Sequence, residues 1–388
     1  MLLFVRGDIM KSVGIIVEYN PFHNGHLYHL NETKKKYKDH IIIAVMSGNF
    51  TQRGDTSIIN KQLKTLIALN HGIDIVVELP FQYATQSADI FAKGAIEILN
   101  NLKINSLVFG SESNDIKKLK EIATKITHNK EYEKIINNNL SLGNNYPKAT
   151  LDALNQINNT EINTPNDILG ICYIKEILKN KYNIEYNCIK RTNDYHDLKI
   201  KNICSASSIR NAIKEKKDIK KSIPQDTYKA LDHLSFIDNY YDLLKYKILS
   251  SNDLSIYQGV NEGIENRINK YILISNSLEE LIKNIKTKRY SYNKIKRMLT
   301  HILIGYTKEE NKILINTNYI RVLGFTKKGQ KYLNKIKKDI NIPLITNYTK
   351  YKNLLYLDYK ATCIYSQIFN KEYSYRLIKD ELNKPIIK

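Results

Sequence analysis

Short apolar runs rich in β-branched residues alternate with helix-patterned stretches through the first half of this 388-residue chain. Such alternation predicts parallel strands joined by crossover helices that cover both faces of the sheet. The predicted fold class is therefore α/β, with a doubly wound parallel sheet. The expected strands are Val13–Glu18, His40–Met46, Ile73–Leu79, Ser106–Phe109 and Ile184–Lys190. The expected helices are Gly25–Lys38, Lys61–Asn70, Ala84–Asn100, Asp115–His128 and Asp167–Asn180.

Polar segments follow every expected strand. In chain order they read NPFHNGH, SGNFTQRGD, PFQYATQS, GSES and RTNDYHD. Ligands of doubly wound sheets bind beyond the carboxyl ends of the strands. We therefore expect the chemistry of the chain to lie at this edge of the sheet.

Helical periodicity dominates the chain from about Ser205 onward. It covers Ser207–Lys216, Tyr228–Ser250 and Asn276–Gly305, and shorter apolar segments follow at Tyr319–Leu323 and Ile342–Ile345. We predict a sheet domain over residues 10–220 and a mainly α-helical region over residues 221–388. No internal repeat is evident.

The net charge of +21 is unevenly distributed. Residues 1–210 hold 26 Lys+Arg and 21 Asp+Glu, a net +5, whereas residues 211–388 hold 34 and 18, a net +16. Because a basic half beside a near-neutral half indicates a polyanionic partner, RNA binding becomes a candidate function. An AT-rich genome, with 51 Lys and only 9 Arg, explains the total charge equally well but not its asymmetry.

The composition also bears on the compartment. No segment approaches the ~18 uninterrupted apolar residues of a membrane span, and the charged opening does not resemble a signal peptide. The cysteines (Cys172, Cys188, Cys204 and Cys363) form no CxxC pair. We therefore predict a cytoplasmic protein with no membrane contact, no disulfide scaffold and no zinc knuckle.

Three histidines fall within the segment YNPFHNGHLYHL at residues 19–30. Metal binding, activation of a nucleophile and phosphate binding are each compatible with closely spaced imidazoles. A zinc site normally requires a third ligand, and the chain has neither HExxH nor a cysteine cluster. Nucleophile activation lacks a partner serine or cysteine nearby. The phosphate interpretation fits the position between a strand and a helix best.

The phosphate interpretation assigns a role to each part of this segment. Asn20-Pro21 is a turn signal that ends the strand, and a helix begins near Asn24-Gly25. A helix N-terminus attracts phosphate, and Gly25 allows close approach of the ligand. His23 and His26, one helical turn apart, would donate hydrogen bonds to phosphate oxygens as charge develops. His29 lies one turn further, and we expect it to pack or to face solvent.

The HxGH pattern at His23–His26 resembles the signature of the class I nucleotidylyltransferase superfamily. The stretch SASSIR at residues 205–210 resembles that superfamily's second motif, in which hydroxyls and an arginine hold the triphosphate. Ser207 or Ser208 would then be both the N-cap of a helix and a phosphate donor. Arg210 would make charge-assisted contacts to phosphate. No KMSKS-like stretch occurs, which argues against an aminoacyl-tRNA synthetase.

Longer sequence segments resemble one particular family within this superfamily. They are VGIIVEYNPFHNGHLYHL, AVMSGNFTQRGD, ELPFQYATQSADIFAKGAI, FGSES, NDILGICYIK, IKRTNDYHD, SASSIR and KTKRYSYNKIKRML. In this order they resemble the blocks of the bacterial tRNA(Met) cytidine acetate ligase family, from about Lys11 to beyond Leu299. Because those proteins begin where Met10 stands, residues 1–9 are expected to be an extension.

The resemblance implies an activity and a site. Members of that family convert acetate and ATP to acetyladenylate and then acetylate the wobble cytidine of elongator tRNA(Met), without acetyl-CoA. It implies Mg²⁺ on the ATP phosphates and no obligate protein partner. The base for acetyl transfer stays open between a histidine and a phosphate oxygen of the intermediate. The implied ATP-binding residues are Val13, Gly14, Ile15, Ile16, Val17, Glu18, Tyr19, Asn20, Pro21, Phe22, His23, Asn24, Gly25, His26, Gly110, Asn166 and Arg191. Asn166 is equally well interpreted as a helix N-cap.

The basic half of the chain suits the RNA substrate. Residues 281–300 hold seven cations and no acid, and helical spacing would place many cations on one face for the RNA backbone. Tyr290 and Tyr292 would stack on unpaired bases, although a solvated lysine-rich helix is the plain alternative. The expected tRNA contacts are Arg53, Lys286, Lys288, Arg289, Lys296 and Arg297. For Arg53, in the loop sequence GNFTQRGD, contact with a phosphate of the nucleotide is the alternative to contact with the RNA backbone.

Two rival functions are compatible with parts of the sequence. One is another HxGH adenylyltransferase with a small phosphorylated acceptor, but such an enzyme has no use for a net +16 second half. The other is a non-catalytic RNA-binding protein that keeps a nucleotide-binding scaffold, but intact HxGH and SASSIR motifs argue against it.

Overall fold

The computed structural model describes residues 10–158, 164–191, 202–315 and 319–388. Five parallel strands form the centre of its sheet in the order β5-β4-β1-β2-β3. They are β1 (Ser12–Val17), β2 (Ile41–Ser47), β3 (Ile75–Leu79), β4 (Ser106–Ser111) and β5 (Glu185–Lys190). The predicted α/β fold with a parallel sheet is thus confirmed, and each strand end lies within two residues of its expected position.

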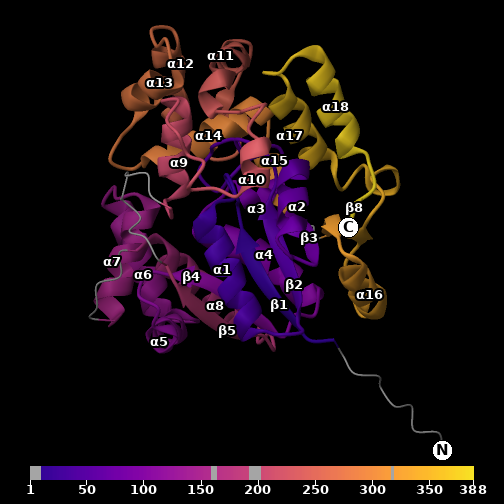
Figure 1. The fold of residues 1–388 in the computed structure, drawn as a ribbon. Coiled ribbons are helices and arrows are strands. Elements are labelled where there is room, and N and C mark those ends of the chain that lie inside the picture. Colours follow the sequence, from indigo (N-terminus) through magenta and orange to yellow (C-terminus); the bar gives the residue numbers. More distant parts are fainter. Residues whose placement is uncertain (1–9, 159–163, 192–201, 316–318) are drawn as a thin grey trace, which may run out of the picture.

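Alternate side chains of the central strands enter two hydrophobic cores, one on each face of the sheet. In β2, the side chains at positions 41, 43 and 45 share a core with α4 (Ala88–Asn101) and α8 (Pro165–Lys179). Those at positions 42, 44 and 46 share the other core with α1 (Asn24–Lys36) and α2 (Lys61–Asn70). A strand apolar on both faces is expected where helices cover both sides of a parallel sheet, as in Figure 1.

The remaining helices of the first half are α3 (Phe81–Ala84), α5 (Ile116–Ile126), α6 (Lys130–Ser141) and α7 (Tyr146–Asn158). The expected helix Ala84–Asn100 corresponds to α4, which begins four residues later because the extended Ser87 is its N-cap, and Ala84 instead ends the short helix α3. Helices α6 and α7 were not among the predicted elements.

The second half contains a helical region with its own core, formed by α11 to α14 and drawn at the top of Figure 1. The helices after β5 are α9 (Ala206–Lys214), α10 (Gln225–Lys229), α11 (Tyr241–Leu249), α12 (Ile264–Ile272), α13 (Leu278–Ile285), α14 (Tyr292–Ile304), α15 (Lys308–Leu314), α16 (Lys327–Ile336), α17 (Tyr356–Ser366) and α18 (Lys371–Glu381). The expected helix over Asn276–Gly305 is interrupted, because Lys286 leaves helical geometry and Ser291 caps a new helix. The expected helix over Tyr228–Ser250 is interrupted as well, between α10 and α11.

The end of the chain returns to the sheet, which the predicted helical character of residues 221–388 did not anticipate. Strand β6 (Ile320–Phe325) pairs antiparallel with β3, while β7 (Leu344–Ile345) and β8 (Ile386–Ile387) pair with β6. A boundary at residue 220 therefore does not separate the sheet from the rest of the chain. The pairing partners are distant in the sequence, and two of these strands have only two residues.

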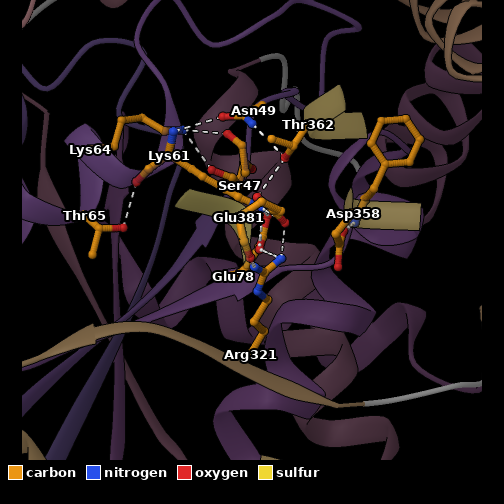
Figure 2. Close-up of polar contacts among 12 residues, drawn as sticks. Ser47, Asn49, Lys61, Lys64, Thr65, Glu78, Arg321, Asp358, Thr362 and Glu381 are labelled. Carbon is orange, nitrogen blue, oxygen red and sulfur yellow. Dashed lines mark hydrogen bonds and ion pairs between the residues drawn. The ribbon is translucent and has the colours of Figure 1, made fainter. Parts of the chain in front are cut away.

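A buried ion cluster of Lys61, Glu78, Arg321 and Glu381 fastens this returning segment to the sheet. Glu78 on β3 lies opposite Arg321 on β6, and an Arg321 Nη1 to Glu78 Oε2 distance of 3.2 Å joins them. Arg321 also donates to Glu381. The Nζ of Lys61 lies 2.6 Å from Glu78 Oε1 and 2.9 Å from Glu381 Oε1. Figure 2 shows these side chains converging, and their two positive charges balance the two carboxylates.

Candidate active site

The segment after β1 forms a tight turn that leads directly into α1. Tyr19 has a left-handed backbone (φ 49°), and the Asn20-Pro21 bond is cis. His23 is the N-cap of α1, and its Nδ1 accepts the N–H of Gly25 at 3.0 Å. A Cβ at Gly25 would lie 2.8 Å from the His23 ring, so only glycine fits beneath it. The prediction that the helix begins near Asn24-Gly25 is confirmed.

His23 and His26 stack on each other, with ring centroids 3.7 Å apart. Burial, followed by the charges of Arg191 and Arg210, lowers the pKa of His23 to about 3. Burial and the neighbouring His23 ring also lower the pKa of His26 well below its usual value. Both imidazoles are therefore neutral at neutral pH. Because Nδ1 of His23 accepts a hydrogen bond, its Nε2 is the protonated nitrogen that can donate to a ligand.

His29, which was expected to pack or to face solvent rather than to take part in chemistry, lines the same cavity as the other two histidines. Burial lowers its pKa to about 4, while a hydrogen bond to the Phe109 backbone opposes that shift. Its Nε2 is buried and has no hydrogen-bond partner among the described residues. The spacing of four residues between Gly25 and His29, one turn along the same helix, was the signal that could have identified it.

The histidines open into a cavity of about 250 Å³ at the carboxyl ends of β1, β4 and β5. The N-terminal parts of α1, α8 and α9 complete its wall. This is the edge at which the sequence predicted chemistry. The predicted nucleotide-site residues that line the cavity are Ile16, Val17, Glu18, Tyr19, Asn20, His23, Gly25, His26, Gly110, Asn166, Arg191, Ser207 and Arg210. Residues 192–197 of the segment RTNDYHD lie outside the described residues.

Several predicted nucleotide-site residues are not in the cavity lining. They are Val13, Gly14, Ile15, Pro21, Phe22, Asn24 and Ser208. The first three belong to the buried interior of β1, where a Cβ on Gly14 would lie 2.7 Å from Leu99 of α4. The side chain of Asn24 instead donates to the carbonyls of Asn202 and Lys221, each at 2.8 Å, and so holds α1 against the segment around α9.

The SASSIR stretch forms the first turn of α9, but its N-cap is Ser205 rather than Ser207 or Ser208. The Oγ of Ser205 accepts the N–H of Ser208 at 3.1 Å. This leaves Ser207 at the cavity, where its Oγ accepts from Arg210 at 3.2 Å. Arg210 also donates to the Asn20 carbonyl at 2.8 Å, so the SASSIR motif is tied directly to the turn that carries the histidines.

Asn166 lies at the start of α8, but Thr164 is the N-cap of this helix, so the N-cap interpretation of Asn166 is wrong. The backbone N–H groups of Asn166 and Asp167 donate to Glu112 at 3.1 and 3.2 Å. The Asn166 side chain donates to the other carboxylate oxygen of Glu112 at 2.5 Å. Glu112 thus neutralises this helix end, and Asn166 is left at the cavity wall beside it.

Three arginines, Arg53, Arg191 and Arg210, line the cavity. Burial lowers the pKa of both Arg191 and Arg210, and the charge of Arg53 contributes to each shift. Among the described residues, the Nε of Arg191 has no hydrogen-bond partner, and Glu112 lies 3.8 Å from it. Uncharged imidazoles therefore lie beside converging guanidinium groups, an arrangement suited to a strongly anionic ligand.

Lys64 links the carboxyl ends of β1 and β2 through hydrogen bonds. Its Nζ donates to the backbone carbonyls of Glu18, Ser47 and Gly48 at 2.9, 2.8 and 2.9 Å. These carbonyls lie just beyond β1 and at the end of β2, so one side chain links the two strand ends. Burial lowers the pKa of Lys64 to about 7.

The basic segment, residues 281–300, does not form one helix with its cations on a single face. Lys288 and Arg289 lie in the loop between α13 and α14, which Lys286 begins. Lys296 forms an ion pair with Asp55, and Nη1 of Arg297 donates to the Gln52 carbonyl at 3.3 Å. Both therefore face the first half of the chain, because α14 packs against the loop after β2.

The two tyrosines expected to stack on bases differ in exposure. Tyr290 is buried and donates to the Asn261 carbonyl at 2.6 Å, so it cannot present its ring to a base. Tyr292 is 45 % exposed and remains accessible.

Within the described part of the chain, no helix is long and apolar enough to cross a membrane. The same residues include no group of three or more His, Cys, Asp or Glu side chains that could hold a metal ion.

The fold and the cavity define a class of protein. A parallel sheet with an HxGH turn after its first strand, and a hydroxyl- and arginine-bearing helix beside it, is the arrangement of a nucleotidyl transferase. The HIGH Nucleotidyl Transferase family model matches residues 10–381.

Individual relatives narrow the assignment. A tRNA(Met) cytidine acetate ligase of Geobacillus sp. is 38 % identical over 97 % of this chain and 99 % of its own length. That of Caldicellulosiruptor saccharolyticus is 40 % identical, covering 94 % and 96 % of the two chains. The Thermotoga maritima TmcAL structure bound with alpha-thio ATP has a TM-score of 0.87 at 33 % identity, covering 97 % of this chain and 99 % of that one. The chain belongs to the tRNA(Met) cytidine acetate ligase family.

Proposed function

We propose that this enzyme activates acetate with ATP as acetyladenylate and transfers the acetyl group to the exocyclic amine of the wobble cytidine of elongator tRNA(Met), giving N4-acetylcytidine. One observation carries the proposal: the HxGH turn, Arg191 and the SASSIR helix line one cavity at the strand ends. The names of the relatives support the substrate, and the ATP analogue bound by the Thermotoga maritima protein supports ATP as the nucleotide.

In the first step an oxygen of acetate attacks the α-phosphorus of ATP, and pyrophosphate leaves. Acetate is already ionised at neutral pH, so this step needs no general base. Catalysis then rests on positioning and on neutralising the charge that moves to the equatorial and leaving oxygens. His23, which can donate from Nε2, and His26 would contact the phosphates, and Arg191 and Arg210 would supply the positive charge.

Magnesium is expected to enter with ATP. Phosphate oxygens and water supply most of its ligands when Mg²⁺ is bound with a nucleotide. The carboxylates of Glu18 and Asp55 also line the cavity, and an oxygen from either could complete such a coordination shell.

In the second step the cytosine amine attacks the acetyl carbon and AMP leaves. The acetyl group is drawn from acetate and not from acetyl-CoA. Lys286, Lys288 and Arg289 would contact the tRNA backbone, since they lie in one loop beside an open groove that Lys288 and Arg289 line. A wobble base is already unpaired in the anticodon loop, so it can reach the cavity without base-pair opening. We place this reaction in the cytoplasm.

The proposal is tested by incubating the protein with MgATP, labelled acetate and elongator tRNA(Met), followed by nucleoside mass spectrometry. We expect N4-acetylcytidine only when ATP and acetate are both present. A tRNA with uridine at the wobble position is the matched control and should stay unmodified. Acetylation that requires acetyl-CoA, or no acetylation at all, would contradict the proposal.

A further inference from the structure

The loop that follows β2 brings Arg53 to the nucleotide cavity. Residues 51–55 form a compact turn, in which Thr51 N–H donates to the Asp55 carbonyl at 2.9 Å and Gly54 N–H donates to the Thr51 carbonyl at 3.1 Å. The N–H of Gln52 donates to the Glu18 carboxylate at 2.7 Å, which ties the turn to the end of β1. Every residue of the turn except Gly54 lines the cavity.

Helix α14 holds this turn from the opposite side through several independent contacts. Lys296 forms an ion pair with Asp55 in which the two side chains are only 10 % and 21 % exposed. Thr300 Oγ1 donates to the Gly54 carbonyl at 2.8 Å, and Arg297 donates to the Gln52 carbonyl.

Packing at Gly54 makes this junction intolerant of displacement. Gly54 has a left-handed backbone, with φ of 76°. A Cβ at this position would lie 2.4 Å from the backbone carbon of Lys296, which cannot move aside as a side chain could. The turn and α14 are therefore in direct backbone contact, and the position of one determines that of the other.

The positive charge of Arg53 contributes to the lowered pKa of three other arginines. It contributes to the lowered pKa of Arg191 and Arg210 on the nucleotide side, in both cases after burial as the larger cause. It acts likewise on Arg297 of α14, whose pKa burial lowers to about 10. The turn that carries Arg53 thus lines the nucleotide cavity and also contacts α14.

We propose that Arg53 acts in the ATP half-reaction as a phosphate contact, and that Lys296 and Thr300 of α14 are positioning residues that set it in the cavity. The inference rests on the proposed function. It assigns to Arg53 and Lys296 a role in the ATP half-reaction, whereas the sequence had suggested both residues as tRNA contacts. The bond from acetate oxygen to the α-phosphorus forms while the bond from that phosphorus to the bridging oxygen of pyrophosphate breaks. Arg53 then neutralises charge on the phosphates as pyrophosphate leaves, and no proton moves.

The first test measures acetate-dependent ATP–pyrophosphate exchange in the complete absence of tRNA. Arg53→Gln should lower the kcat/KM for exchange by roughly 100-fold, as expected for a lost electrostatic contact to a reacting phosphate. The matched control is Arg376→Gln, because Arg376 lies on α18 with a 70 % exposed side chain. It should leave exchange within about twofold of wild type, as exposed changes usually do.

The second test asks whether Lys296 positions Arg53, and it distinguishes this role from a contribution of Lys296 to folding. Lys296→Met should lower kcat for exchange about tenfold, with a smaller change in KM, because misplaced catalytic groups chiefly cost rate. Lys296→Arg keeps the ion pair and should restore most of kcat. Thr300→Val, which removes only the bond to the Gly54 carbonyl, gives an independent variant if Lys296→Met does not fold. Lys125→Met, at an exposed lysine of α5 paired with Glu121, is the control.

The outcomes distinguish this inference from the proposed function. If the wild-type protein shows no acetate-dependent exchange, the proposed function fails and the inference with it. If the wild type exchanges and Arg53→Gln does so at the same rate but acetylates tRNA poorly, Arg53 is a tRNA contact and only the inference is overturned. If Arg53→Gln is impaired while Lys296→Met and Thr300→Val both exchange normally, the positioning role of α14 is overturned.

Discussion

Two groups of charged side chains lie beside the same sheet, one buried and one half-buried, and they are composed differently. The ion cluster contains Lys61 and Arg321 against Glu78 and Glu381, with each charge in contact with an opposite one. The nucleotide cavity instead gathers Arg53, Arg191 and Arg210 around neutral histidines.

The carboxylates around the cavity are shared with other donors. Glu18 accepts the N–H of Gln52, Asp55 pairs with Lys296, and Glu112, which lies 3.8 Å from Arg191, also accepts N–H groups of α8. The cavity lining itself holds four cationic side chains, those of Arg53, Lys190, Arg191 and Arg210, and the carboxylates of Glu18 and Asp55. Desolvated charges are costly unless they are paired, so a balanced cluster can serve the fold alone. The excess positive charge of the cavity is instead suited to an anionic ligand such as ATP. Charge balance thus distinguishes the structural cluster from the binding site.

The largest effect should come from unbalancing the ion cluster. Glu381→Gln leaves two buried cations with a single carboxylate, and breaking such a pair typically costs about 3–5 kcal/mol. Urea unfolding should therefore show a loss of this size in the free energy of unfolding. Glu372→Gln, at an exposed position of the same helix, should change it by less than about 0.5 kcal/mol. A loss below about 1 kcal/mol for Glu381→Gln would mean that the cluster does not hold the returning segment.

A change in the cavity should instead cost activity. His26→Ala removes a ring that stacks on His23 and lines the cavity. We expect acetate-dependent exchange to fall by roughly 10²–10³-fold, as for other lost transition-state donors. His40→Ala, at a histidine outside the cavity, should exchange at the wild-type rate. Equal losses in both variants would remove the distinction between site and scaffold.

The neutral histidines predict a pH dependence of stability. Burial holds the pKa of His23 at about 3 in the folded protein, below its unfolded value of about 6.5. The unfolded chain therefore binds more protons between these values, so this contribution is complete above pH 6.5 and is lost as the pH falls.

The size of that loss can be measured in one variant. At about 1.4 kcal/mol per pH unit, His23 should cost roughly 2 kcal/mol between pH 6.5 and 5. His23→Asn keeps a good helix cap but cannot titrate. Between pH 6.5 and 5, the free energy of unfolding of this variant should therefore fall by roughly 2 kcal/mol less than that of the wild type. Identical pH profiles for variant and wild type would show that His23 is not held neutral.

The smallest effect should come from the exposed basic loop. Lys288→Ala with Arg289→Ala should weaken tRNA binding about tenfold and reduce the slope of log affinity against log salt by roughly 1.5–2. Acetylation of tRNA would then fall at low tRNA concentration. An unchanged salt dependence would show that this loop does not contact the RNA backbone.

Local sequence patterns were sufficient for the central sheet and for the HxGH turn and the SASSIR helix that line the cavity. Continuous β-branched runs identify β1 to β5, and HxGH and SASSIR mark helix ends whose chemistry is local. Strands β6 to β8 were missed because two have only two residues and all depend on long-range pairing. The partners of Lys296 and Arg297 in the loop after β2 could not be predicted from the sequence either, since they lie 241 and 245 residues away along the chain. The position of His29 in the cavity lining could not be predicted, because the exposure of one helix face depends on what packs against it.

The most direct test of the central claim is acetate-dependent ATP–pyrophosphate exchange by the wild-type protein, measured with and without tRNA. A cavity built for the phosphates of ATP and neighbouring acetate predicts exchange that requires acetate and proceeds without tRNA. No exchange with acetate, or exchange only with a phosphorylated acceptor, would contradict the account.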